Sequence, residues 1–65
     1  MTLTINGQPA DHAAATLAEL VEALGLADAK VATALNGTFV PVRTRAATPL
    51  SHGDRIEVVA PRQGG

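Results

Sequence analysis

The sequence predicts an α+β fold in which a mixed sheet of four or five strands packs on one helix. Three observations point to this fold. Short segments that alternate polar and apolar residues, typical of half-buried strands, lie near both ends of the chain. Asn-Gly pairs, the strongest short hairpin signal, occur at Asn6-Gly7 and Asn36-Gly37. One amphipathic stretch with helical spacing lies between them, and such a helix must cover one face of a sheet.

The first hairpin begins with the strand Thr2 to Ile5, whose apolar residues we expect to face inward. Asn6-Gly7 suits a type I′ turn, because both central positions of that turn need a positive φ. The return strand is expected over about Gln8 to His12. Pro9 has no N–H to donate, so this strand should lie at a sheet edge.

The helix is predicted to begin at a capping box, in which the Thr16 hydroxyl accepts from the Glu19 amide. The Glu19 carboxylate is expected to accept in return from the Thr16 amide. Gly25 suits a left-handed helix end, with Leu26 packing back on the last turn. The helical spacing predicts one apolar stripe, made of Leu17, Leu20, Val21 and Leu24.

The second half of the chain predicts three more strands. Val31 to Leu35 and Thr38 to Val40 form the second hairpin, and Arg55 to Ala60 is the last strand. Residues Arg43 to Pro49 show no period and indicate a connecting loop or a short helical turn, while Leu50 is an isolated apolar anchor. Since the helix connects the two hairpins as a crossover, a mixed sheet is expected.

The chain has 65 residues, which predicts one small domain over residues 1–60 and a flexible tail over 61–65. It contains no Cys, which excludes disulfides and thiolate metal sites. His12 and His52 lie far apart in sequence, so we expect isolated, exposed histidines and no metal site.

The charge is nearly balanced, with five basic and six acidic residues and a net charge of −1. This balance argues against a nucleic-acid partner or a polybasic membrane surface, and Arg43 and Arg45 are expected to be solvated. The sequence shows neither an apolar run of about 18 residues nor the pattern of a signal peptide. A cytoplasmic location is therefore expected.

The last two residues of the sequence are Gly64 and Gly65. Without side chains they offer a bare α-carboxylate on a thin tether that suits a narrow channel. The five residues from Pro61 to Gly65 reach at most about 17 Å at roughly 3.3–3.6 Å per residue. Such a tail suits delivery of its carboxylate to the active site of another protein.

The order of these elements, followed by Gly-Gly, resembles the β-grasp fold of ubiquitin-like proteins, and more narrowly the ThiS family of sulfur carriers in thiamine biosynthesis. No single segment is very specific, but their joint order at this length is. The chain departs from the family pattern at Val42 and in the polar segment Pro61-Arg62-Gln63. The matching segments are Ile5-Asn6-Gly7, Thr16-Leu17, Leu20, Val31 to Asn36, Val40-Pro41, Leu50, Gly53 to Val59 and Gly64-Gly65.

The resemblance implies chemistry at the Gly65 carboxylate. A ThiF-type adenylyltransferase would activate it with ATP and Mg²⁺, and a cysteine desulfurase or another persulfide donor would then supply sulfur. The resulting thiocarboxylate would pass its sulfur to a ThiG-type thiazole synthase, and Gly64 would provide clearance. The sequence shows no phosphate-binding glycine loop and no acid–base set. We therefore expect a cosubstrate that binds no cofactor and is not an enzyme.

A partner-binding surface is predicted from strand alternation. If Ile56 faces the helix, Val59 points to the opposite side of the sheet, together with Ala34 and Phe39. We expect these three residues to form a shallow apolar patch that meets partners. The alternative is that Phe39 packs into a minor cluster at a sheet edge.

Three other functions remain open at this point. A small subunit of molybdopterin synthase shares the fold and the thiocarboxylate chemistry but delivers sulfur to a pterin precursor. A ubiquitin-like modifier would transfer its activated terminus to a lysine amine. A plain interaction domain would not need Gly64 and Gly65.

Overall fold

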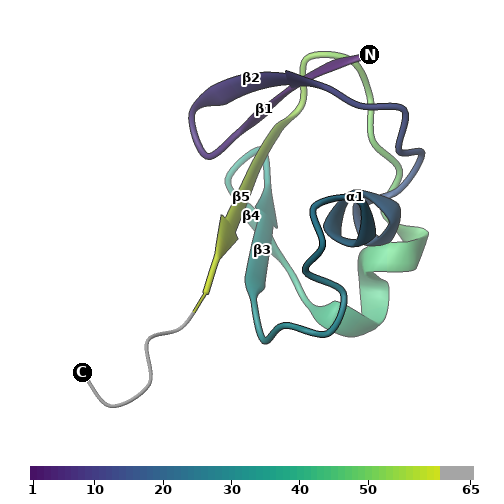
Figure 1. Ribbon diagram of the computed structural model, residues 1–65, viewed down its shortest axis with the longest axis vertical. Coiled ribbons are helices and arrows are strands. Elements are labelled where there is room, and N and C mark those ends of the chain that lie inside the picture. The colour runs from purple at the N-terminus through teal and green to yellow at the C-terminus, as the bar shows by residue number, and fades with distance from the viewer. Residues whose placement is uncertain (61–65) are drawn as a thin grey trace.

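The computed structural model describes residues 1–60 and confirms a mixed sheet with one α-helix (Figure 1). The predicted tail, residues 61–65, lies outside the described residues. The predicted strands and helix are all present. Where an observed strand end differs from the predicted one, the difference is one residue. The elements are β1 (Thr2–Ile5), β2 (Gln8–Asp11), α1 (Leu17–Ala23), β3 (Ala32–Leu35), β4 (Thr38–Val40), the 3₁₀ helix η1 (Val42–Ala47) and β5 (Arg55–Val59).

The last strand lies in the middle of the sheet, whose order is β2-β1-β5-β3-β4. Both hairpins are antiparallel, β5 is antiparallel to β3, and the parallel contact is between β1 and β5. Pro9 lies on β2, at the sheet edge, as predicted. Because β5 is central, the segment that ends in Gly64-Gly65 follows a strand that is paired on both sides.

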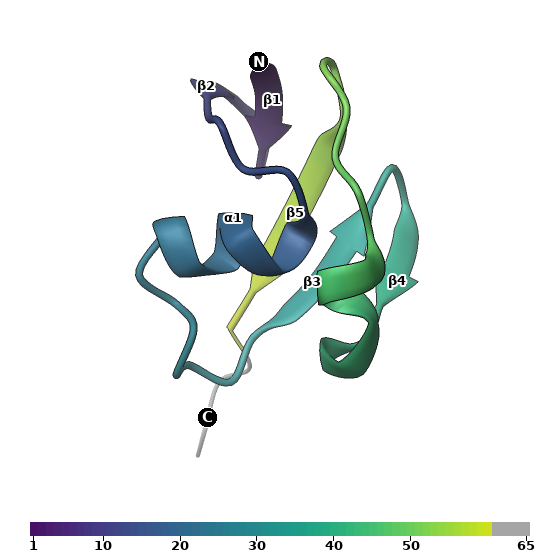
Figure 2. The ribbon, with the colours of Figure 1, turned by 90° about the vertical axis from the view of Figure 1, so that its right-hand side faces the viewer.

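One face of the sheet is covered by α1 and η1, and the other face carries no helix within residues 1–60 (Figures 1 and 2). The predicted helical stripe is confirmed, since Leu17, Leu20 and Val21 are buried and Leu24 packs against the core. Burial of each such side chain stabilises the fold by roughly 1.5–3 kcal/mol. The buried cluster consists of Leu3, Ala14, Leu17, Leu20, Val40, Leu50 and Ile56.

The capping box at the start of α1 differs in one hydrogen bond from the predicted one. The Glu19 amide donates to the Thr16 hydroxyl at 3.2 Å, as expected. The Glu19 carboxylate, however, accepts from the amide of Ala15 at 3.0 Å and not from that of Thr16. At the other end Gly25 has φ = +77°, and the Leu26 amide bonds to the Val21 carbonyl at 3.0 Å, which closes the helix as predicted.

The prediction that Arg45 is solvated is wrong. Residues Val42 to Ala47 form the short helix η1, and Arg45 on it is only 7% exposed. Its Nε donates to the Thr33 hydroxyl at 2.9 Å and its Nη2 donates to the Val31 carbonyl at 2.6 Å. The Thr33 hydroxyl in turn donates to the Val40 carbonyl at 2.8 Å. These bonds fasten η1 to the second hairpin and satisfy polar groups that would be expensive to bury alone.

Candidate functional site

The candidate functional site is at the end of β5, because the segment with Gly64 and Gly65 begins there. These two predicted site residues lie outside the described residues, so the structure does not test them. The described part of the chain shows how β5 is held and what surrounds its end. Both features are set by the two Asn-Gly turns and by the uncovered face of the sheet.

Each Asn-Gly turn holds β5 through its asparagine. Asn6 and Asn36 both have φ = +50°, the left-handed region that Asn tolerates better than most residues. The Asn36 Oδ1 accepts from the amide of Arg55 at 2.9 Å, at the start of β5. The Asn6 Oδ1 accepts from the amide of Val58 at 2.8 Å, near the end of β5. The hairpin signals in the sequence therefore also anchor the central strand.

The uncovered face carries the three predicted patch residues. Phe39 is 65% exposed and Val59 is 61% exposed, so Phe39 does not pack into a minor cluster within residues 1–60. Ala34, which is half-buried, lies directly opposite Phe39 in the register of β3 and β4. Val59 lies opposite the exposed Ala32. The structure thus brings Ala34, Phe39 and Val59 to one face, and their binding to a partner stays a prediction.

Two charged side chains of β5 also lie on this face, Arg55 and Glu57. Glu57 lies opposite Ala34 on β5, in the same cross-strand row as Phe39, and it is exposed. Arg55 is also exposed and lies one alternation earlier on β5. The alternation that predicted Val59 on the outer face also places Arg55 and Glu57 there, so the pattern could have indicated these charges. A partner for this face must accommodate the Glu57 carboxylate next to Ala34.

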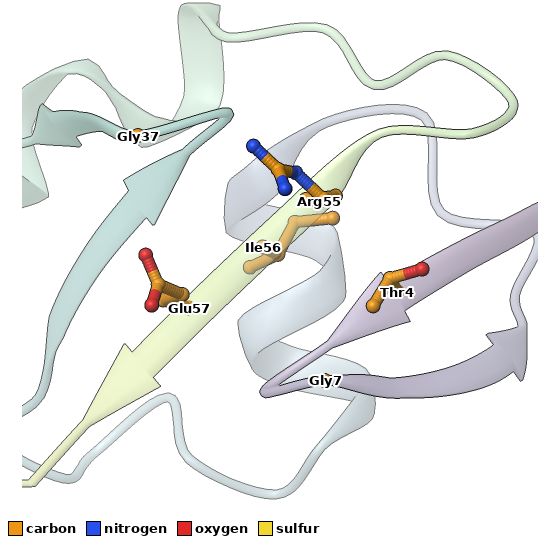
Figure 3. Close-up of a pocket in the computed structure, with 6 residues that line it drawn as sticks. All are labelled: Thr4, Gly7, Gly37, Arg55, Ile56 and Glu57. Carbon is orange, nitrogen blue, oxygen red and sulfur yellow. The ribbon is translucent and has the colours of Figure 1, made fainter.

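A hollow of about 330 Å³ lies on this face between the two turns (Figure 3). Gly7 and Gly37 stand on its two sides, and Arg55, Ile56 and Glu57 contribute from β5. Neither glycine has an atom within 4 Å of where a Cβ would lie. Their positive φ values, and not close packing, account for glycine at these positions.

Both histidines contact the first residues of the chain, and the His12 amide donates to the Met1 carbonyl at 3.0 Å. His52 is exposed and its Nδ1 accepts from the Thr2 amide at 3.1 Å. His12 is half-buried, so the expectation of an exposed His12 is wrong. In residues 1–60 no group of three or more His, Cys, Asp or Glu side chains could hold a metal ion. None of the helices in this part of the chain has the length and apolarity needed to cross a membrane.

Comparison with known proteins covers nearly the whole chain. The ThiS family model matches residues 3–65. The chain is similar to the crystal structure of a thiamine biosynthesis protein (ThiS) from Geobacter metallireducens, with 35% identity, a TM-score of 0.84 and complete coverage of both chains. It is also similar to an NMR solution structure of a thiamine biosynthesis protein from Geobacter metallireducens. There the identity is 33%, the TM-score is 0.81, and the match covers all of this chain and 88% of the other.

A search of curated proteins gives no match. The two structural similarities, with TM-scores of 0.84 and 0.81, confirm the predicted ubiquitin-like β-grasp fold. The family match includes the Gly64-Gly65 end as well as the sheet. The chain therefore belongs to the ThiS family.

Proposed function

We propose that this protein is the sulfur carrier for the thiazole part of thiamine. The observation that carries the proposal is the family match over residues 3–65, which includes the terminal Gly64-Gly65. The two similar structures, both of thiamine biosynthesis proteins, support the thiamine branch over the molybdopterin branch. In this role the chain is a cosubstrate and its partners supply the catalysis, in the cytoplasm.

The chemistry occurs at the Gly65 carboxylate. A ThiF-type adenylyltransferase joins this carboxylate to the α-phosphate of ATP, with Mg²⁺ in the partner's site, and pyrophosphate leaves. The terminal sulfur of a persulfide, from a cysteine desulfurase or a similar donor, attacks the acyl carbon and AMP leaves. A thiol then cleaves the acyl disulfide and leaves a thiocarboxylate on Gly65, which a ThiG-type thiazole synthase accepts. The chain has no Cys, so its main-chain terminus is where sulfur would be held.

The sheet face with Ala34, Phe39 and Val59 is proposed as the surface that docks on these partners. Phe39 is a large aromatic side chain that the fold leaves 65% exposed. Aromatic residues are enriched among the residues that dominate binding at interfaces. Val59 lies on β5 directly before the segment that leads to Gly65, so a partner on this face would lie close to the start of the tail. Gly64 would leave clearance beside the reacting carboxylate.

Growth without thiamine tests the biological role. In cells from which the gene for this chain is deleted, we expect that growth requires added thiamine or its thiazole precursor. The wild-type gene should restore growth without either supplement, and a gene lacking the codons for Gly64 and Gly65 should not. The matched control is Val42→Ala, an exposed side chain on η1 that should restore growth fully.

Other outcomes would point to the alternatives. A defect in molybdenum-cofactor enzymes, with normal growth without thiamine, would favour the pterin branch. Covalent conjugates of the chain with other proteins, lost when Gly65 is deleted, would favour a protein modifier. Full rescue by the chain without Gly64 and Gly65 would contradict every role that uses the terminal carboxylate.

A further inference from the structure

We propose that Asn6 is a positioning residue for the carboxyl-terminal tail: its side chain replaces a missing strand partner and keeps the end of β5 in the sheet. This role rests on the proposed function, because it matters when residues 61–65 must reach a partner's active site. It is carried by the contacts between Asn6 and Val58, which lie seven residues before the terminus of the sequence.

The need for such a partner follows from the register of β1 and β5. These parallel strands pair at Thr4 with Arg55 and at Ile5 with Ile56. The Asn6 amide adds one more bond, to the Ile56 carbonyl at 2.9 Å, before the chain turns away. The next backbone groups of β5 on this side are the N–H and C=O of Val58. An unpaired N–H or C=O at this position would favour fraying of the strand end.

The Asn6 side chain bonds to both of these groups. Its Oδ1 accepts from the Val58 N–H at 2.8 Å, and its Nδ2 donates to the Val58 carbonyl at 3.1 Å. A side-chain amide carries a donor and an acceptor in one plane, as a peptide group does. Asn6 therefore extends the β1 side of the sheet by one position, after its own backbone has left the strand.

Asparagine combines two properties that this position needs. Its backbone has φ = +50°, which glycine, Asn and Asp adopt more readily than other residues. Glycine has no side chain to offer, and an ionised Asp has acceptors but no donor for the Val58 carbonyl. The hairpin requirement alone would be met by Gly at residue 6, so the turn does not explain the two bonds to Val58.

The second turn provides an internal comparison. Asn36 has the same φ of +50°, and its Oδ1 accepts from the Arg55 amide at 2.9 Å, while its Nδ2 donates to Asp54 Oδ1 at 3.1 Å. It therefore holds the start of β5, whereas Asn6 holds the end that continues into the tail. The two asparagines have the same turn geometry and the same number of side-chain bonds but act at opposite ends of one strand.

Loss of the Asn6 bonds would lengthen the tether. If residues 58–60 leave the sheet, the tether grows from five residues to eight, and its maximum reach rises from about 17 to about 28 Å. A longer, looser tether lowers the effective concentration of the terminal carboxylate at a docked partner's site. The added residues must also be ordered again on binding, which costs conformational entropy. Both effects weaken productive binding without changing the chemistry.

The test compares Asn6→Gly with the matched control Asn36→Gly. Hydrogen exchange by NMR should show the Val58 amide exchanging about two- to tenfold faster in Asn6→Gly, because the loss of one hydrogen bond lowers protection by roughly that factor. In Asn36→Gly the Val58 amide should keep its protection. In the adenylation assay, Asn6→Gly should raise KM for the carrier about three- to tenfold with kcat within about twofold, while Asn36→Gly leaves KM unchanged.

The proposal is overturned if Asn6→Gly leaves both the Val58 exchange and KM at wild-type values, or if Asn36→Gly raises KM equally. If Asn6→Gly does not fold, Asn6→Asp decides by KM alone, because it keeps an acceptor for the Val58 amide but repels the Val58 carbonyl; a raised KM supports the proposal and a wild-type KM overturns it. Failure of the proposed function is recognised separately. In that case the wild-type chain is not adenylated, while the exchange measurement still reports whether Asn6 holds β5.

Discussion

The two faces of the sheet carry apolar side chains but place them in opposite environments. On the inner face, Leu3 and Ile56 are at most 1% exposed and pack under α1. On the outer face, Phe39 and Val59 are more than half exposed, although they lie on the same strands as buried neighbours. This difference shows that the inner face holds the domain together, while the outer face leaves apolar side chains exposed, where the proposed partners would bind.

The largest expected effect comes from removing an inner-face contact. Leu20→Ala should lower the free energy of unfolding by about 2–5 kcal/mol, because Leu20 is fully buried in the α1 stripe. In a domain this small, such a loss is a large part of the total stability. Urea unfolding followed by circular dichroism measures it. The outer-face counterpart, Phe39→Ala, should change stability by no more than about 0.5 kcal/mol. Equal losses in the two variants would contradict the division between the faces.

A second, smaller effect is expected when the buried hydrogen bonds of Arg45 are removed. Arg45→Met keeps much of the side-chain volume but leaves the Val31 carbonyl without its donor, so we expect a loss of about 1–3 kcal/mol. The control is Arg43→Ala on the same 3₁₀ helix, which is exposed and should change stability by less than about 0.5 kcal/mol. Thermal or urea unfolding of both variants measures the difference. If Arg45→Met is as stable as Arg43→Ala, these hydrogen bonds do not stabilise the second hairpin.

The third prediction tests whether the outer face binds the adenylating partner. Phe39→Ala should raise KM for the carrier in adenylation by about tenfold, the size expected for an aromatic side chain at the centre of an interface. Val42→Ala is the control, because Val42 is 70% exposed but lies on η1, away from the sheet face with Phe39. Steady-state kinetics with increasing carrier measures both. Unchanged adenylation and sulfur-transfer kinetics in a folded Phe39→Ala protein would remove the patch from the account.

Local patterns in the sequence were enough for most of the fold. The alternation of Thr2 to Ile5, the two Asn-Gly turns and the stripe that begins at Leu17 each predicted an element that the structure contains. These signals succeed because each depends on residues close together in the chain. The sheet order could not be derived in the same way. The pairing of β1 with β5 joins residues about fifty positions apart, and no local pattern specifies it.

The errors have a common physical cause. Arg45 lies in a segment without hydrophobic period, so nothing nearby indicated that its guanidinium would find Thr33 and the Val31 carbonyl. The bond from Glu19 to Ala15 depends on how the chain enters α1, which is fixed by the pairing of Leu50 with Ala15. The candidate site shows the same limit. Alternation placed Phe39 and Val59 on one face, but the contact of Asn6 with Val58 required the tertiary structure.

The central claim is that the terminal carboxylate of this chain carries sulfur. Intact-mass analysis tests it most directly, after incubation of the chain with the adenylating partner, ATP, Mg²⁺, a persulfide donor and a thiol that cleaves the acyl disulfide. The predicted result is the exchange of one oxygen for one sulfur on the wild-type chain, located at Gly65 by fragmentation, and no change in a chain that lacks Gly64 and Gly65. An unchanged wild-type mass, with a partner shown to be active on another carrier, would contradict the claim.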